Sequence, residues 1–282
     1  MRADTPSLTA RVVAAWRGLG RRLPTDARLA DDPYGVLFAG RAHRRLATAP
    51  RALLLPLRVP LLYMQVRTKA LDDALLGFVA AGGRQVLILG AGYDARAARF
   101  ADALAGARVL EVDHPATQAR KREVLARAGV DPAVTYVAWD FEARPVAELP
   151  AALAALGHDP RIPTLTLWEG VTMYLSEPAI EATVAAVAAL SAPGSTFVLT
   201  YQDRRRIERP GPIWAAVSRV VARVGEPFTF GWRPEELSDW FAVRGWTLAA
   251  DEDTVDLARR WLPPRHARWV RPRGHHVATF RR

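Results

Sequence analysis

The sequence contains no cysteine, so neither a disulfide framework nor thiolate chemistry is available to it. Lys69 and Lys121 are its only lysines, and its six histidines are scattered apart from the adjacent pair His275 and His276. Adjacent side chains do not converge easily on one ion, whereas zinc sites need three or four ligands together. The sequence therefore predicts no metal site.

Long apolar runs are also missing. The first residues, MRADTPSLTARVVAAW, lack the continuous apolar segment of a signal peptide. The most apolar stretch, ALLLPLRVPLLYM at 52–64, is too short to span a bilayer and is interrupted by Pro56, Arg58 and Pro60. These features predict a cytoplasmic protein without a membrane partner.

The formal net charge is +10, and arginine supplies almost all of the positive charge. The run Arg204, Arg205 and Arg206 and the closing segment WVRPRGHHVATFRR have a composition suited to phosphate contacts. Basic residues are nevertheless spread along the whole chain, which is typical of solvated faces. We expect no specific nucleic-acid partner.

Strand-like and helical segments alternate through the middle of the chain. This alternation predicts an α/β fold with a mainly parallel sheet, right-handed crossovers and helices on both faces. The expected strands are RQVLILG, ARVLEVD, VTYVAWD, TLTLWEG and STFVLTY. The expected helices between them cover 94–104, PATQARKREVLARAG, VAELPAALAALG and the segment that starts at Ser176.

Four regions follow from this pattern. Residues 1–80 form a helical N-terminal cap, and residues 81–201 form a Rossmann-like core. Residues 202–245 form a helical insertion on the substrate side, and residues 246–282 contain a closing pair of strands. Ligands of such sheets bind beyond the carboxyl ends of the strands, so we expect the cap and the insertion to wall that crevice.

A glycine turn follows the first expected strand. Gly90, Gly92 and Ala95 match a nucleotide-binding fingerprint, in which one glycine makes the turn and the next lets the backbone approach a ligand. About twenty residues later the second strand ends at Asp113, whose carboxylate suits ribose hydroxyls. NAD and S-adenosylmethionine both contain an adenosine, and both fit these residues.

The third strand helps to separate the two cofactors. Asp140 and Phe141 lie at its end, where a carboxylate can accept from an adenine amino group and an aromatic ring can pack on the base. Asp140 would serve equally as a helix cap. The chain has no second mononucleotide-binding half with its own glycine loop, as a dinucleotide enzyme requires. S-adenosylmethionine is therefore the favoured cofactor.

Several motifs in the same order and spacing resemble a known family. GAGYDAR, EVDHPATQARKR and WEGVTMYL, with the N-terminal segments LTARVVAAWR, DDPYGVLFAG and YMQVRTKALDDALL, resemble the leucine carboxyl methyltransferase family. They are most similar to its bacterial branch of small-molecule O-methyltransferases, which includes polyketide carboxyl methyltransferases. The resemblance covers nearly the whole chain and implies a class I methyltransferase of secondary metabolism.

The resemblance also implies roles for single residues. Arg67 would grip the methionyl carboxylate, because a guanidinium binds a carboxylate bidentately. Glu169 would face the cofactor's amino group or the substrate, and Tyr174 would line the pocket. The cofactor-binding residues that the resemblance and the motifs imply are Arg67, Gly90, Gly92, Asp94, Asp113, His114, Asp140, Phe141 and Glu169.

His114 departs from the family, which usually carries an apolar residue at that position. It is either a wall of the cofactor site or a proton acceptor, and the candidate catalytic residues are His114, Glu169 and Tyr174. S-adenosylhomocysteine would be the coproduct.

The methyl acceptor stays open. A carboxylate is ionised at neutral pH and needs no base, whereas a hydroxyl, phenol or indole carbon needs proton removal or charge stabilisation. O-methylation of a small-molecule carboxylate or hydroxyl is the favoured reaction. The alternatives are C- or N-methylation of an aromatic small molecule such as an indole and, more distantly, methylation of a nucleic acid. The sequence does not indicate an oligomeric state.

Overall fold

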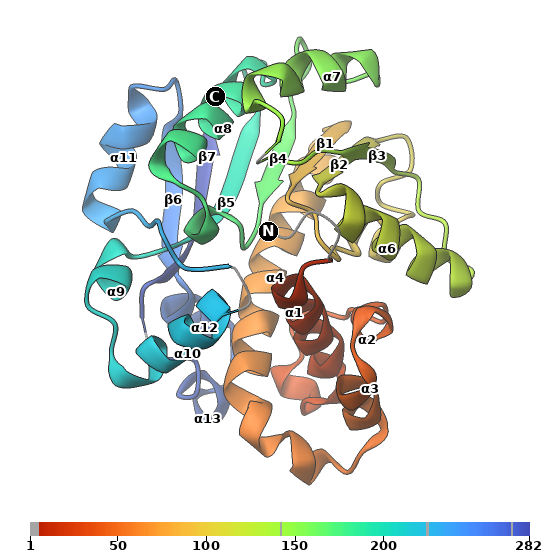
Figure 1. The fold of residues 1–282 in the computed structure, drawn as a ribbon, viewed down its shortest axis with the longest axis vertical. Coiled ribbons are helices and arrows are strands. Elements are labelled where there is room, and N and C mark those ends of the chain that lie inside the picture. Colours follow the sequence, from red (N-terminus) through yellow and green to blue (C-terminus); the bar gives the residue numbers. More distant parts are fainter. Residues whose placement is uncertain (1–5, 142, 224–225, 272) are drawn as a thin grey trace.

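The computed structural model describes residues 6–282 except 142, 224–225 and 272. A seven-stranded sheet in the described part of the chain has the order β3-β2-β1-β4-β5-β7-β6 (Figure 1). Strands β1 to β5 are parallel, and β7 is antiparallel to both β5 and β6. The bounds are Gln85–Leu89 (β1), Arg108–Asp113 (β2), Thr135–Ala138 (β3), Leu165–Trp168 (β4), Thr196–Gln202 (β5), Thr247–Asp253 (β6) and His275–Arg281 (β7). The predicted mainly parallel α/β sheet and its closing strand pair are confirmed.

Helices precede the first strand, connect the parallel strands and fill the segment between β5 and β6. Before β1 lie Leu8–Leu19 (α1), Gly35–Phe38 (α2), Arg41–Thr48 (α3) and Arg58–Ala80 (α4). Between the strands lie Arg96–Arg99 (α5), Pro115–Arg127 (α6), Leu149–Ala155 (α7) and Glu177–Ala189 (α8). The remaining helices are Arg204–Glu208 (α9), Pro212–Arg223 (α10), Pro234–Ala242 (α11), Thr254–Trp261 (α12) and Pro264–Ala267 (α13).

Both faces of the sheet are buried, as the continuous apolar strands predict. Successive strand residues point to opposite faces. In β1, Val86 and Ile88 belong to the hydrophobic cluster that includes residues of α4 and α12. Leu87 and Leu89 belong to a second cluster that includes residues of α7, α8 and α11. The sheet is thus the middle of three layers.

The N-terminal helices lie against the edge where the parallel strands end (Figure 1). Helix α1 packs on α2 and α4, and α4 also contacts β4, β5 and α12. The side chain of Ser7 caps α1 by accepting a hydrogen bond from the Ala10 N–H at 3.0 Å. The expected helical character of the region before the first strand is confirmed.

The helix expected over 94–104 is much shorter in the structure. Only Arg96–Arg99 is helical there. The side chains of Arg96 and Arg99 both turn inward and pair with Asp72 of α4, so the buried side of this segment carries charge rather than an apolar stripe. The turn therefore positions two guanidinium groups instead of packing as an amphipathic helix. The helix that starts after Ser176 is confirmed, with the Ser176 side chain as its cap.

None of the helices in the described part of the chain has the length and apolar character needed to cross a membrane. The described residues also contain no group of three or more His, Cys, Asp or Glu side chains placed to hold a metal ion.

Phe197 of β5 is fully buried among aromatic rings. Its substitution therefore tests how the closing strands pack against β5. Its ring centroid lies 5.4 Å from that of Trp246 and 6.2 Å from that of Phe280. We expect Phe197→Ala to lower the free energy of unfolding by about 3–5 kcal/mol, because a cavity replaces the ring. Val243→Ala, at a side chain that is 82% exposed, is the control and changes it by less than about 0.5 kcal/mol. Denaturant titration measures both, and equal small effects would contradict this packing.

Candidate functional site

The predicted cofactor-binding residues gather at the carboxyl edge of the parallel strands. Gly90 and Gly92 follow β1, Asp113 ends β2, Asp140 follows β3, and Glu169 follows β4. The chain crosses from β1 to β2 on one side and reaches β4 on the other, so the strand order reverses next to β1. Parallel sheets bind their ligands at this kind of switch point.

The turn after β1 depends on its glycines. Gly90 and Gly92 have φ values of 60° and 50°, a backbone region that side chains disfavour. A Cβ on Gly90 would lie 2.4 Å from Cγ2 of Val171, which is too close for any contact. The two glycines therefore allow a tight turn that packs closely against Val171.

Asp113 is bound to this turn. Its two carboxylate oxygens accept hydrogen bonds from the backbone N–H of Gly92 and, at 2.6 Å, from that of His114. Burial raises the pKa of Asp113, and the two backbone donors act in the opposite direction. The carboxylate is thus held at the end of β2, beside the glycine turn, as the sequence predicts.

Glu169 and Arg67 form a buried ion pair. Arg67 Nε lies 2.8 Å from Glu169 Oε1, and Arg96 Nη1 lies 2.7 Å from Glu169 Oε2. Burial would raise the pKa of Glu169, but the two guanidinium groups outweigh burial and lower it well below its usual range. Glu169 is therefore ionised at neutral pH, which makes it a binding group for cations rather than a proton donor.

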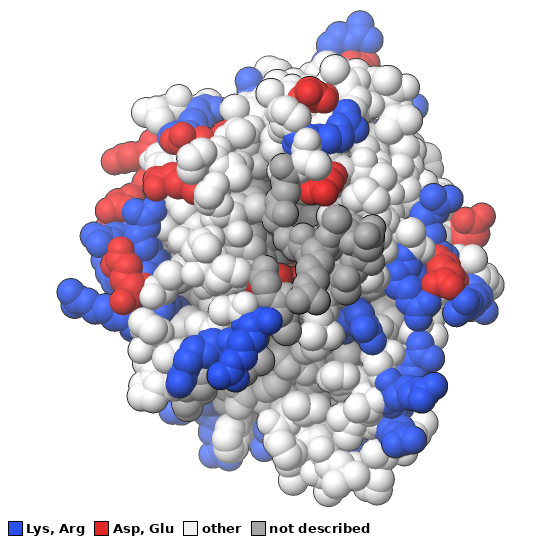
Figure 2. Space-filling model, viewed as in Figure 1, with Lys and Arg blue, Asp and Glu red and all other residues white. Residues whose placement is uncertain are grey.

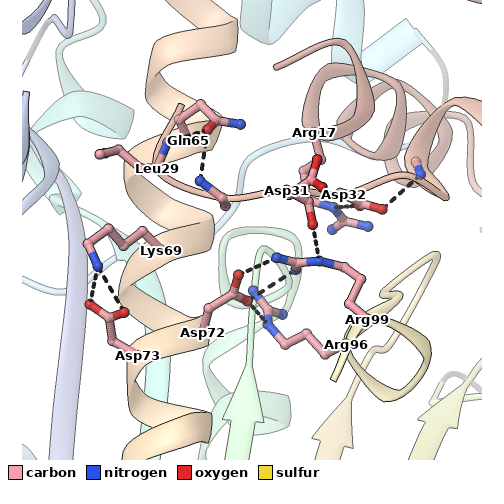
Figure 3. Close-up of polar contacts among 12 residues, drawn as sticks. Arg17, Leu29, Asp31, Asp32, Gln65, Lys69, Asp72, Asp73, Arg96 and Arg99 are labelled. Atoms are coloured by element: carbon pink, nitrogen blue, oxygen red, sulfur yellow. Dashed lines mark hydrogen bonds and ion pairs between the residues drawn. The ribbon is translucent and has the colours of Figure 1, made fainter. Parts of the chain in front are cut away.

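Arg96 extends the pair into a network. Its guanidinium also binds Asp94. Its Nε lies 2.8 Å from Asp72 Oδ1 on α4 (Figure 3). Arg99 binds the same Asp72 carboxylate from the other side. Asp94 in turn accepts from the Arg96 N–H at 2.7 Å, and the arginines lower its pKa although burial acts to raise it.

A second ion pair anchors α1 beside this network. Arg17 Nε lies 3.1 Å from Asp32 Oδ2 (Figure 3). Arg17 Nη2 donates to the backbone carbonyl of Tyr93 in the glycine turn. Asp32 also accepts from the N–H groups of Tyr34 and Gly35. The DDPYG segment is therefore a structural element that fixes α1 relative to the glycine turn.

His114 lies between the ends of β2 and β3. It caps α6: its Nδ1 accepts from the Ala116 N–H at 3.2 Å, while Nε2 lies 3.6 Å from Asp140 Oδ2. Phe141 is partly buried and packs against the apolar cluster on the α7 and α8 side. The structure thus brings His114 and Asp140 together at one side of the edge, about where the sequence predicts an adenine pocket.

Tyr174 lies on the other side of the edge, after β4. Its ring stacks on Phe228 with centroids 5.5 Å apart, and Phe228 stacks on Trp214 at 5.1 Å. Burial, the largest effect, raises the pKa of Tyr174, so its hydroxyl stays protonated near neutral pH. These rings come from the loop after β4 and from the 202–245 region, which the sequence predicts on the substrate side.

The start of α1 covers the edge. Ser7 Oγ donates to Glu226 Oε1 at 2.9 Å, and its backbone N–H donates to Thr117 Oγ1 of α6 at 3.2 Å. A Cβ on Gly92 would lie 3.3 Å from the Ala10 Cβ. The first turn of α1 therefore connects α6 with the 202–245 region above the glycine turn.

Sequence reasoning missed three residues that the structure places at this edge. Arg96 is visible only as a basic residue after the glycine turn, and its partner Glu169 lies 73 positions away. Tyr63 precedes Arg67 by one helical turn, a spacing that could have found it. His275 reaches the edge because β7 pairs with β5, and no sequence signal fixes that register.

The chain matches known proteins over most of its length. Residues 10–188 match the family described as leucine carboxyl methyltransferase. A Streptomyces avermitilis protein named "Putative S-adenosyl-L-methionine-dependent methyltransferase/SAV474" is 40% identical over 190 residues, which are 67% of this chain and 63% of that protein. The chain thus covers less than two thirds of that relative. A Streptomyces coelicolor protein of the same description, SCO6443, is 35% identical over 264 residues, 90% of this chain and 85% of its own.

Solved structures share the fold. A DUF574 family protein from Streptomyces avermitilis superimposes with a TM-score of 0.61 at 16% identity, with all of both chains covered. A structure described as a "putative methyltransferase" from Thermobifida fusca gives a TM-score of 0.59 at 20% identity, with 100% of this chain and 96% of that chain covered. The fold is that of class I methyltransferases, and the chain belongs to the leucine carboxyl methyltransferase family.

Proposed function

We propose that this protein transfers the methyl group of S-adenosylmethionine to an oxygen atom of a small molecule in the cytoplasm. The observation that carries the proposal is the buried Arg67–Glu169 pair at the end of β4. The methionyl end of the cofactor carries one ammonium and one carboxylate, and an adjacent carboxylate and guanidinium complement those two charges.

The other residues of the edge fit the rest of the cofactor. Gly90 and Gly92 have positive φ values and no side chains, so a ligand would be able to approach the backbone of the turn closely. Asp113 would bind the ribose hydroxyls through the lone pairs that its two backbone donors leave available. His114, Asp140 and Phe141 would surround the adenine. Arg96 Nη2 is buried and has no hydrogen-bond partner in the described part of the chain, and a bound carboxylate would supply one.

The bound cofactor supplies an activated methyl group on a sulfonium, so the protein has to position the acceptor and exclude water. Ser7, at the start of α1, bonds to α6 and to Glu226, and this segment would exclude water from the bound cofactor. Glu169, which two arginines hold ionised, would bind the ammonium rather than accept a proton from the acceptor. His114 would serve as a wall, because its Nδ1 is already used as a helix cap. Tyr174 would line the acceptor side and donate a hydrogen bond.

The positive charge does not by itself favour a nucleic-acid substrate. On the face shown in Figure 2 the basic side chains lie in several separate groups, and several lie beside acidic ones. The half-buried Arg244 pairs with Glu181, and the exposed Arg273 pairs with Asp256. Pairs of this kind neutralise the field that would attract a phosphate backbone. This distribution supports a small-molecule substrate. The family description agrees with a carboxylate as one of the candidate acceptors.

The site of methylation tests the reaction. We expect ¹³C-methyl S-adenosylmethionine, incubated with the protein and a panel of small planar carboxylic acids, phenols, amines and indoles, to give products whose new methyl carbon is bonded to oxygen. Two-dimensional NMR distinguishes methyl ester or methyl ether from N- or C-methyl. A product methylated only on nitrogen or carbon, or transfer only to an added oligonucleotide, would contradict the proposal. Glu169→Gln is the inactive control.

The Arg67 assignment is tested by binding alone. We expect Arg67→Ala to weaken S-adenosylhomocysteine binding about 10- to 150-fold, which corresponds to the loss of a hydrogen bond to a charged group. Arg67→Lys recovers only part of the affinity, because a point charge does not replace the planar fork. Arg58→Ala, on the same helix but stacked on Trp269, is the matched control and leaves affinity unchanged. Isothermal titration calorimetry measures all four proteins, and unchanged affinity in Arg67→Ala would show that another residue holds the carboxylate.

A further inference from the structure

His275 lies at the ligand edge of the sheet although the proposed cofactor site does not use it. It is the first residue of β7 and pairs with Gln202, the last residue of β5. Because β7 runs antiparallel to β5, its beginning meets the carboxyl end of β5. In the strand order, β5 and β7 lie on the side of β4 away from β1 and β2. His275 is therefore on the half of the edge opposite the residues that fit the adenosine.

Tyr63 connects His275 to the methionyl end of the proposed cofactor site. The Tyr63 hydroxyl lies 3.4 Å from Nδ1 of His275, and the two ring centroids are 4.9 Å apart. The guanidinium carbon of Arg67, one turn later on α4, lies 5.7 Å from the centre of the Tyr63 ring. Since Arg67 binds Glu169, the imidazole is two contacts away from the pair that complements the methionyl group.

A row of aromatic rings continues from His275 to Tyr174. Trp214 of α10 meets His275 edge to face with centroids 5.2 Å apart. Phe228 stacks on Trp214 with an angle of 5° between the ring planes, and Tyr174 stacks on Phe228. The rings stack on one another and Arg206 lies over Trp214, so the partly buried row offers an apolar surface of ring edges at the substrate side. Planar rings pack favourably on such a surface.

The charges around His275 favour an oxygen that loses a proton. Arg206 from α9 has buried Nε and Nη2 atoms without a hydrogen-bond partner in the described residues, and so has Nε1 of Trp214. The Arg206 guanidinium carbon lies 4.5 Å from the centre of the Trp214 ring. Burial, together with the positive charges of Arg206 from α9, Arg67 from α4 and the adjacent His276, lowers the pKa of His275 well below its usual range. The imidazole is thus neutral near pH 7 and has one ring nitrogen that accepts.

We propose that His275 and Tyr63 hold the hydroxyl of the methyl acceptor and that this acceptor is a phenol, whose ring packs against the edges of Trp214 and Phe228. This inference rests on the O-methyl transfer proposed above. A carboxylate acceptor would need only cationic partners, whereas a neutral imidazole beside arginines suits a group that arrives as O–H and reacts as an anion.

Methyl transfer to the phenol needs no reactant other than the cofactor and the phenol itself. The acceptor oxygen forms a bond to the methyl carbon, and the carbon–sulfur bond breaks with its electron pair remaining on sulfur. The hydroxyl proton leaves to water, because the burial and positive charges that keep His275 neutral also disfavour its protonation, and the imidazole holds the hydroxyl by a hydrogen bond. Arg206 and Arg67 stabilise the negative charge that develops on the oxygen as the proton leaves.

The test uses 4-nitrophenol as the probe, because its anion has a visible absorption band. We expect 4-nitrophenol to bind the protein saturated with S-adenosylhomocysteine, and the bound probe to be ionised at a pH where most of the free probe is not. His275→Phe keeps the ring packing but removes both nitrogens and weakens probe binding at least about tenfold. His275→Gln, which restores an acceptor, recovers part of the affinity and of the anion band. His43→Gln, on helix α3 of the cap, is the control and changes neither.

Two further measurements separate the outcomes. The affinity for S-adenosylhomocysteine stays the same in all the variants, because His275 does not contact the residues assigned to the cofactor other than through Tyr63. The carboxylate 4-nitrobenzoate binds more weakly than 4-nitrophenol and is insensitive to His275→Phe. The inference is overturned if 4-nitrophenol does not bind at millimolar concentration or if His275→Phe leaves its binding unchanged. It is also overturned if 4-nitrobenzoate binds as tightly as 4-nitrophenol. Methyl ester formation on carboxylates with no phenol binding would overturn this inference and leave O-methylation intact, whereas N- or C-methyl products would overturn both.

Discussion

The charge of Arg96 is buried with only 1% of the residue exposed, and three carboxylates surround it. They belong to Asp72, Asp94 and Glu169, which come from α4, the glycine turn and the end of β4. An unpaired ion at such a position would cost several kcal/mol, so the guanidinium is stable only where all three elements meet. The carboxylates raise the Arg96 pKa well above its ordinary value, although burial acts to lower it. This pairing fixes the cap helix, the turn and the strand end relative to one another.

The geometry of the candidate site follows from this constraint. Arg67 lies on the same helix as Asp72, and Glu169 accepts from both Arg67 and Arg96. A shift of α4 along its axis would therefore disturb the Arg96–Asp72 contact together with the pair that we assign to the methionyl group. Among the described residues the charges of this network balance, because four arginines pair with four carboxylates. The arginines are Arg17, Arg67, Arg96 and Arg99, and the carboxylates are Asp32, Asp72, Asp94 and Glu169. A zwitterionic ligand end can join it without adding net charge.

Much of the fold could be predicted from sequence, because apolar strands, glycine turns and helix caps are local signals. The parallel strands and the Ser176 cap are confirmed for that reason. The short α5 could not be predicted, since its arginines turn inward to a carboxylate on a distant helix. At the site, Gly90, Gly92 and Asp113 follow from spacing along two neighbouring strands. The pairing of Arg96 with Glu169 and the arrival of His275 at the edge depend on strand register and tertiary packing, which no local pattern encodes.

The central claim is that the buried arginine network holds Arg67 and Glu169 in place for the amino-acid end of the cofactor. Calorimetric affinities for S-adenosylhomocysteine and for 5′-methylthioadenosine, which lacks that end, test it most directly. S-adenosylhomocysteine carries an ammonium and a carboxylate that 5′-methylthioadenosine lacks. The unmodified protein should therefore bind S-adenosylhomocysteine at least about a hundredfold more tightly. With both Arg67→Gln and Glu169→Gln in place, the ratio should fall below about tenfold while 5′-methylthioadenosine binds as before. Equal affinities for the two ligands in the unmodified protein would contradict the account.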